Sequence, residues 1–461
     1  MFGGRHFGVG WEMDGTDVST RLDRWGEPLP SSPGVPERRP GGHWWWPIGA
    51  ICVVLILAGG FYLVRRSVIQ SLSASCREAR RAKDWERLEE LAERWHWWQR
   101  GKAAPLIYLA EAANETKRFE RAAEVLERLP DADPMTPLAL VERSSILFGP
   151  LNRPIEGAAS LERAIKLNPK LIEARRRLIY FYAYTLQRRK MVQLAYDTIE
   201  HDCDLPETYV YLMLQDALSF SDAYDVNTRW FLGNRDEELF MVARAIYRIT
   251  TKGLDDTVDP RDGPVDESGI PYHRKVVQEY FTRFPNNLEL LAYFLQLSVT
   301  AGDVEEAARL LSRAPPEAEA DNRFWRYMGW VHTARGELYQ AKKCYEKALF
   351  LNGYDHLSRH QLAAVERRFK QLDRVKALEE LAREGKMLRR QILQLENVAR
   401  VPPGLLKRMA AYAEKCGDEL AAGQLRFRIE QWSEEWSRAD PKPSLRRAAA
   451  ESRRALESDA K

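Results

Sequence analysis

The segment Phe324–Gly353 reads FWRYMGWVHTARGELYQAKKCYEKALFLNG and decides the fold. Its small residues Gly329, Ala341 and Ala348 occupy positions where a core helix ordinarily carries bulk. A small residue at the point where two helices cross lets their backbones approach closely, and larger neighbours fill the remaining space. Gly336, between the two runs, suits a left-handed turn. The segment therefore predicts two antiparallel helices joined by a short turn.

The spacing of these residues resembles the tetratricopeptide repeat, in which a period of about 34 residues carries large and small side chains at fixed places. The same frame fits the chain again upstream and downstream, with weaker matches at Ile172 and His356. The frames start at Ile69, Ala103, Leu138, Ile172, Leu288, Asn322, His356 and Pro403. The resemblance implies an all-α fold, an α-solenoid of tetratricopeptide-like helix-turn-helix repeats that covers most of residues 69–436.

Composition divides the chain into segments around these repeats. Residues 1–46 hold many glycines and prolines, and an Asp-rich and Gly-rich stretch interrupts the middle of the chain. We expect a flexible polar tail over 1–46, a transmembrane helix over 47–66, an N-terminal repeat array over 67–205, degenerate helical repeats over 206–287 with a loop at 252–271, a C-terminal array over 288–436, and a polar tail over 437–461.

An uncharged run precedes the repeats. Residues 47–64 contain no charged side chain, and 18 residues of helix span about 27 Å, close to a bilayer core of about 30 Å. Three tryptophans precede the run, and Arg65 and Arg66 follow it. Interfacial tryptophans and flanking arginines are typical of membrane helices. A signal peptide begins nearer the chain start, so we expect a retained single-pass anchor. A buried helix of a soluble protein is the alternative.

Positive charge is more abundant after the uncharged run than before it. The positive-inside rule then places the repeats in the cytoplasm. Long domains can cross a membrane regardless of such charges, so the outer side stays open.

Site motifs are scarce. The 70 basic and 67 acidic residues nearly balance, which suits solvated helix faces and not a nucleic-acid footprint. Five cysteines lack metal-site spacing, and the HDCD stretch at His201–Asp204 cannot turn all its side chains to one ion. No phosphate-binding or nucleophile motif occurs. We expect no cofactor, no metal, no small-molecule substrate and no enzymatic activity.

The resemblance also implies a concave groove lined by the first helix of each repeat. Basic and aromatic residues stand at the corresponding positions, which suits proteins or peptides as partners, with an acidic or C-terminal segment as one option. The candidate groove residues are Arg176, Tyr180, Tyr184, Arg323, Arg326, Trp330, His360 and Arg367. Solvated surface arginines would give the same pattern. The family's carboxylate clamp is not matched, since Arg326 and Trp330 stand where Lys and Asn are expected.

These features lead to a membrane-anchored scaffold for protein–protein interaction. The alternative is a non-catalytic docking subunit of a cell-envelope assembly, secretion or polysaccharide machine. An enzyme of unrecognised type is a third hypothesis, which loss of turnover on mutating one acid or histidine would support.

Overall fold

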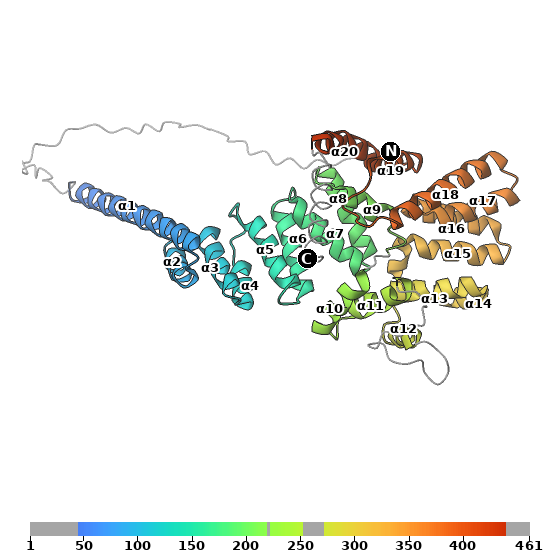
Figure 1. The fold of residues 1–461 in the computed structure, drawn as a ribbon, viewed down its shortest axis with the longest axis horizontal. Helices are drawn as coiled ribbons and strands as arrows, with labels where there is room; N and C mark the ends of the chain where they lie inside the picture. The colour runs from blue at the N-terminus through green and yellow to red at the C-terminus, as the bar shows by residue number, and fades with distance from the viewer. Residues whose placement is uncertain (1–44, 219–221, 252–271, 439–461) are drawn as a thin grey trace, which may run out of the picture. The chain divides into compact units, whose positions relative to one another are not determined.

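The computed structural model describes residues 45–218, 222–251 and 272–438. Regular structure in these residues is helical, with twenty α-helices, one short 3-10 helix and no strand (Figure 1). The loop expected at 252–271 and nearly all of the tails expected at 1–46 and 437–461 lie outside the described residues. The expected all-α class is confirmed.

The helices of the N-terminal half are α1 (Trp45–Ala82), α2 (Trp85–Trp98), α3 (Ala103–Glu115), α4 (Phe119–Glu127), α5 (Thr136–Phe148), α6 (Pro154–Leu167), α7 (Ile172–Tyr184), α8 (Arg188–Glu200), α9 (Pro206–Met213), α10 (Ala223–Gly233) and α11 (Glu238–Thr251). The second half holds α12 (Tyr272–Arg283), α13 (Leu288–Ala301), α14 (Val304–Ser312), the 3-10 helix η1 (Pro316–Ala320), α15 (Asn322–Ala334), α16 (Leu338–Leu351), α17 (His356–Arg368), α18 (Leu372–Leu393), α19 (Pro403–Lys415) and α20 (Glu419–Arg438).

The helix starts reproduce the repeat frames read from the sequence. Six of the first helices, namely α3, α7, α13, α15, α17 and α19, begin at the first residue of a frame. In the first frame, Cys76, Ala79, Leu88 and Ala92 are buried together in one core, where α1 packs with α2 and α3. The predicted succession of helix pairs is therefore confirmed.

Packing in the α15–α16 pair requires a glycine at position 329. A Cβ built on Gly329 would lie 2.7 Å from a ring carbon of Tyr345, which is itself fully buried. Ala341 and Ala348 are also fully buried. Gly336 adopts a positive φ of 77° between the two helices, as the turn requires. The close approach of these two helices therefore depends on the missing side chain at position 329.

Helix α1 is one continuous helix of 38 residues. Its apolar part is long enough to cross a membrane, with a mean hydropathy of 1.8 and no buried residue in that window. Among the described residues no second helix meets the same length and composition. Residues 1–64 and 65–461 form two separate units. From Arg65 onward, α1 serves as the first helix of the first repeat.

Helix α9 departs from the regular stack. Every residue of α9 after Pro206 is buried. Part of it, including Leu212 and Met213, shares a core with Tyr354, Leu388 and other residues of the C-terminal helices. Helix α20 also packs on α8, and the two lie near each other in Figure 1. The C-terminal helices thus fold back onto α8 and α9.

We expect Gly329→Ala to lower the free energy of unfolding by about 1–3 kcal/mol, because the new Cβ overpacks against Tyr345. The free energy of unfolding is measured by urea denaturation, monitored by far-UV circular dichroism. Gly423→Ala is the matched control. It lies inside α20 with nothing within 4 Å of a Cβ, so alanine there should stabilise by up to about 1 kcal/mol. Equal effects of the two changes would contradict this account of the α15–α16 packing.

Candidate partner-binding cleft

A cleft of about 590 Å³ opens across α5 and α7, the first helices of two successive pairs, and α9. Helix α10 and the α18–α19 connection complete it. Its lining residues are Ser145, Phe148, Gly149, Glu173, Arg176, Arg177, Tyr180, Phe181, Glu207, Tyr211, Arg229, Trp230, Val398 and Ala399. The volume falls within the range of roughly 300–1,000 Å³ typical of ligand sites. Two predicted groove residues, Arg176 and Tyr180, therefore lie together in a real cavity.

The predicted stripe on α7 follows the helical period. Arg176, Tyr180 and Tyr184 stand four residues apart, so they share one face of the helix. The rings of Tyr180 and Tyr184 stack with centroids 3.8 Å apart. Tyr184 is buried and donates a hydrogen bond to Asp222. Burial raises the pKa of Tyr180 to about 12, so its hydroxyl stays protonated. Tyr180 thus forms a neutral wall, with Tyr184 packed behind it.

Charge in the cleft is unequally divided. The Arg176 guanidinium lies 3.5 Å from Glu173 and 4.0 Å from Glu207, and about half of its side chain stays exposed. Arg177 donates hydrogen bonds to Glu173 and Ser145. Burial raises the pKa of Glu207 above its ordinary value. Three arginines therefore face two carboxylates, counting Arg229 on α10.

Arg229 is exposed and pairs with no carboxylate among the described residues. Its neighbour Trp230 is buried in an aromatic cluster, with ring centroids 6.1 Å from Phe148 and 5.6 Å from Phe181. The indole Nε1–H of Trp230 finds no hydrogen-bond partner in the described part of the chain. A buried indole N–H usually has an acceptor. The α10 side of the cleft thus combines an available cation with an unused donor.

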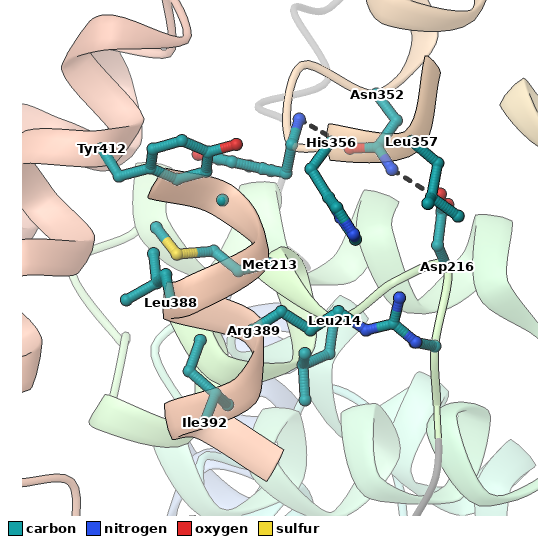
Figure 2. Close-up of a pocket in the computed structure, with 13 residues that line it drawn as sticks. Met213, Leu214, Asp216, Asn352, His356, Leu357, Leu388, Arg389, Ile392 and Tyr412 are labelled. Carbon is teal, nitrogen blue, oxygen red and sulfur yellow. Dashed lines mark hydrogen bonds between the residues drawn. The ribbon is translucent and has the colours of Figure 1, made fainter. Parts of the chain in front are cut away.

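A second cavity is much smaller. Figure 2 shows Asp216, Asn352, His356, Arg389 and Tyr412 among its lining side chains. Its volume of about 20 Å³ leaves room for about one water molecule. Burial and the neighbouring Arg389 lower the pKa of His356 to about 4, so the ring is neutral at physiological pH. We interpret this cavity as a packing space at the junction of the helices.

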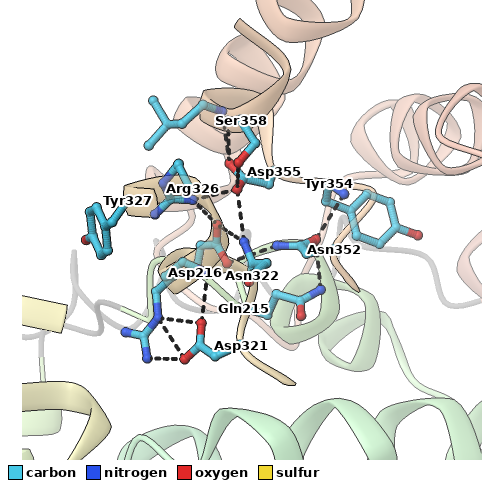
Figure 3. A network of polar contacts seen from close by, with 12 residues as sticks. Gln215, Asp216, Asp321, Asn322, Arg326, Tyr327, Asn352, Tyr354, Asp355 and Ser358 are labelled. Carbon is cyan, nitrogen blue, oxygen red and sulfur yellow. Dashed lines mark hydrogen bonds and ion pairs between the residues drawn. The ribbon is translucent and has the colours of Figure 1, made fainter. Parts of the chain in front are cut away.

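Asp216, on the wall of that cavity, belongs to a buried polar network (Figure 3). Its carboxylate accepts hydrogen bonds from Asn352 at 2.9 Å, Asn322 at 3.0 Å and Arg326 at 2.9 Å. Asp355 accepts from Arg326 at 2.6 Å and caps α17 through the backbone N–H of Leu357 and Ser358. The network ties the end of α9 to α15 and α17.

Arg323 and Arg326 were expected to face a partner, and the structure places them elsewhere. Both are buried, at 5% and 9% exposure. Arg323 pairs with Glu289 and Asp321 at 2.6 Å, while Arg326 pairs with Asp216 and Asp355. Because a buried guanidinium needs nearby carboxylates to offset its desolvation, these arginines are occupied within the chain. Their repeat position alone did not reveal the acids that approach from α13 and from the end of α9.

The remaining predicted residues lie on other surfaces. Trp330 is half-buried and packs against the main core. His360 is exposed on α17, and Arg367 on the same helix pairs with Glu379. None of the three lines the cleft.

The sequence reasoning missed the contribution of α10. Arg229 and Trp230 fall in a stretch without a clean repeat frame, so no position could be assigned to them. Val398 and Ala399 lie about 170 residues further along and reach the cleft only because the C-terminal helices fold back. A basic residue beside a tryptophan was the one local signal available.

Asp204 of the HDCD stretch has a structural role. It accepts hydrogen bonds from Tyr209 at 2.8 Å and from Arg428 at 3.1 Å. Within the described residues, no three His, Cys, Asp or Glu side chains gather in a way that could hold a metal ion.

No family model and no curated protein matches the chain. Among solved structures, it is similar to a tetratricopeptide repeat protein from Parabacteroides merdae, with 12% identity, 65% of this chain and 99% of that chain covered, and a TM-score of 0.25. It is also similar to yeast Tom70, with 12% identity, 82% of this chain and 91% of that chain covered, and a TM-score of 0.26. Human IFIT1 is a third similar structure, with 12% identity, 71% of this chain and 76% of that chain covered, and a TM-score of 0.29.

These TM-scores are too low to support conclusions about the path of this chain or its partners. The repeat architecture rests instead on the helix starts and on the packing at Gly329. The fold is tetratricopeptide-like.

The buried carboxylate of Glu289, which lies between two arginines, predicts that the stability of the protein depends on pH. Burial acts to raise the pKa of Glu289, but Arg188 and Arg323 outweigh it and hold the pKa at about 2, below the ordinary 4.5. A depressed carboxyl pKa contributes stability above the unfolded value, and that stability is lost as the pH falls toward the folded value. We expect the free energy of unfolding to drop by about 3 kcal/mol between pH 4.5 and 2 from this group.

Urea denaturation at a series of pH values measures this drop. Glu289→Gln should destabilise the protein at neutral pH and flatten the profile below pH 4.5. Glu305→Gln is the control, because its side chain is 82% exposed and its pair with Arg335 lies at the surface. An unchanged slope in Glu289→Gln would show that another group governs the acid transition.

Proposed function

We propose that the chain is a membrane-anchored scaffold that binds an acidic segment of a protein partner in the cleft of α5, α7, α9 and α10. The role is binding and not catalysis. The observation that carries the proposal is the cleft itself, which places exposed arginines beside aromatic walls on the first-helix face of the repeats.

Charge favours an acidic ligand. Arg176 keeps about half of its side chain exposed, and Arg229 has no carboxylate partner among the described residues. A guanidinium binds a carboxylate through two parallel hydrogen bonds, so each arginine can orient one acidic side chain. Glu173 engages Arg176 and Arg177 in the free protein, so an acidic segment would bind by replacing Glu173 at these guanidinium groups.

The apolar part of the cleft supplies area. Phe148, Tyr180, Phe181 and Trp230 line it together. Aromatic side chains and arginines dominate the energetics of protein interfaces because they bury large surfaces with few rotatable bonds. An acidic segment with one bulky apolar side chain would use both parts of the cleft.

The anchoring part of the proposal rests on α1. Its first half carries apolar side chains that no other described residue covers, including Ile56 at 72% and Leu57 at 67% exposure. A soluble protein rarely leaves such a continuous apolar helix in water. A bilayer removes that surface from water.

We expect charge reversal in the cleft to abolish partner binding. The exposed cleft residue Ala399 is replaced by p-benzoylphenylalanine in the full chain, and light-induced protein adducts are quantified in cells. Adding Arg176→Glu and Arg229→Glu should lower adduct yield by about tenfold or more, since each lost arginine–carboxylate contact is worth about 1.5–3 kcal/mol.

Arg335→Glu is the control, since Arg335 is an exposed arginine that pairs with Glu305 away from the cleft. It should leave the adducts unchanged. If adducts persist at full yield in the cleft double variant, the cleft does not bind the partner through its arginines.

The side of the membrane is a separate prediction. Following the excess of positive charge after the apolar run, we place the repeats in the cytoplasm. An epitope tag at the C-terminus should then resist added protease in intact cells stripped of outer layers and be digested after permeabilisation. Digestion before permeabilisation would place the repeats outside.

A further inference from the structure

Tryptophans at the end of α2 lie near Arg65, the residue that follows the apolar stretch. Arg65 directly follows the uncharged residues 47–64. Its Nε and Nη2 donate hydrogen bonds to the carbonyl oxygen of Trp98 at 3.3 and 3.2 Å. Helix α2 therefore runs back along the α1 segment that begins at Arg65, and its last residue lies beside Arg65. The last carbonyls of a helix need such donors, and a cation suits that end.

The aromatic residues at this end of α2 differ in exposure. Trp95 is buried in the first core and donates to Gln99. Trp97 is 62% exposed, and its ring lies edge-on against Trp98 with centroids 4.9 Å apart. Two neighbouring indoles at the surface of an isolated soluble domain leave a large apolar area in water. Indole rings are enriched where a membrane meets water, because one edge is apolar and the N–H is polar.

Positive charge surrounds these rings. Arg65 and Arg66 precede the α1–α2 contact, and Arg100 and Lys102 lie in the turn from α2 to α3. All four are exposed, and none pairs with a carboxylate in the described part of the chain. Arg80, Arg118 and Arg121 of the first two repeats pair with glutamates, so the basic residues near Trp97 and Trp98 differ from these three in having no carboxylate partner among the described residues. A basic, aromatic surface is complementary to anionic lipid headgroups.

We propose that Arg65, Arg66, Trp97, Trp98, Arg100 and Lys102 form a lipid-docking surface that lies in the headgroup layer of an anionic membrane. The inference rests on the proposed anchoring by α1 and deepens it. Arg65 directly follows the apolar stretch in the sequence, and its hydrogen bonds to Trp98 bring the end of α2 beside it.

The test uses the full chain reconstituted in vesicles of phosphatidylethanolamine and phosphatidylglycerol. Trp97 is replaced by p-benzoylphenylalanine, and lipid adducts formed under light are detected by mass spectrometry. Phe61, in the apolar stretch, and Tyr339, on α16, serve as matched positions, because the three aromatic side chains are 62%, 63% and 62% exposed in the order 97, 61, 339. We expect lipid adducts at 61 and 97 and none at 339.

The outcomes separate the two proposals. Adducts at 61 with none at 97 overturn the docking surface and leave the anchor intact. Absence of adducts at 61 overturns the anchor and the docking surface together. Protein adducts at 97 in place of lipid adducts would assign the surface to a protein partner and overturn the proposal.

The role of charge has its own variant. Arg100→Glu with Lys102→Glu should reduce the lipid adducts at position 97 severalfold in vesicles that contain phosphatidylglycerol, with no change at position 61. Equal yields at position 97 with and without the two changes would overturn the electrostatic part of the docking surface.

Discussion

Buried carboxylates hold helices α8 and α9 to helices of the C-terminal half of the chain. Glu289 accepts hydrogen bonds from Arg188 of α8 and Arg323 of α15 at once. Asp216, just after α9, binds Arg326 and two asparagines. Removing one member of a buried ion pair costs about 3–5 kcal/mol, because the partner is left charged and desolvated. These contacts therefore favour the packing of α8 and the end of α9 against α13, α15 and α17.

The cleft depends on that arrangement. A second set of contacts fixes the last helix pair on α8 and α9, since Asp418 accepts hydrogen bonds from Tyr196 and Tyr354, and Asp204 accepts from Arg428. The α18–α19 connection is thereby brought to α5, α7, α9 and α10, where Val398 lines the cleft. The cleft is therefore complete only in the folded-back chain.

The arginines fall into two groups, those that pair with a carboxylate inside the fold and those that stay accessible to a ligand. Arg175, Arg188, Arg323 and Arg326 are at least partly buried, and each meets a carboxylate within 3 Å. Surface arginines in the cleft and at the end of α2 keep solvent access, and several lack a carboxylate partner among the described residues. Burial makes a guanidinium part of the fold, whereas an exposed and unpaired guanidinium still gains free energy from an anionic ligand. Exposure and pairing, more than repeat position, therefore distinguish the arginines that remain accessible to a ligand.

The sequence by itself determined the local architecture. The period of about 34 residues predicted where first helices begin, and helices start at Ala103, Leu288, Asn322 and His356 as the frames require. These features depend on contacts within one helix pair or between neighbours, and such contacts repeat along the chain. The tertiary structure alone decided which arginines are buried, and it brought Trp230 and Val398 into one cleft. Those outcomes involve contacts such as Arg188 with Glu289 and Arg326 with Asp216, which join residues 101 and 110 positions apart and which no local period encodes.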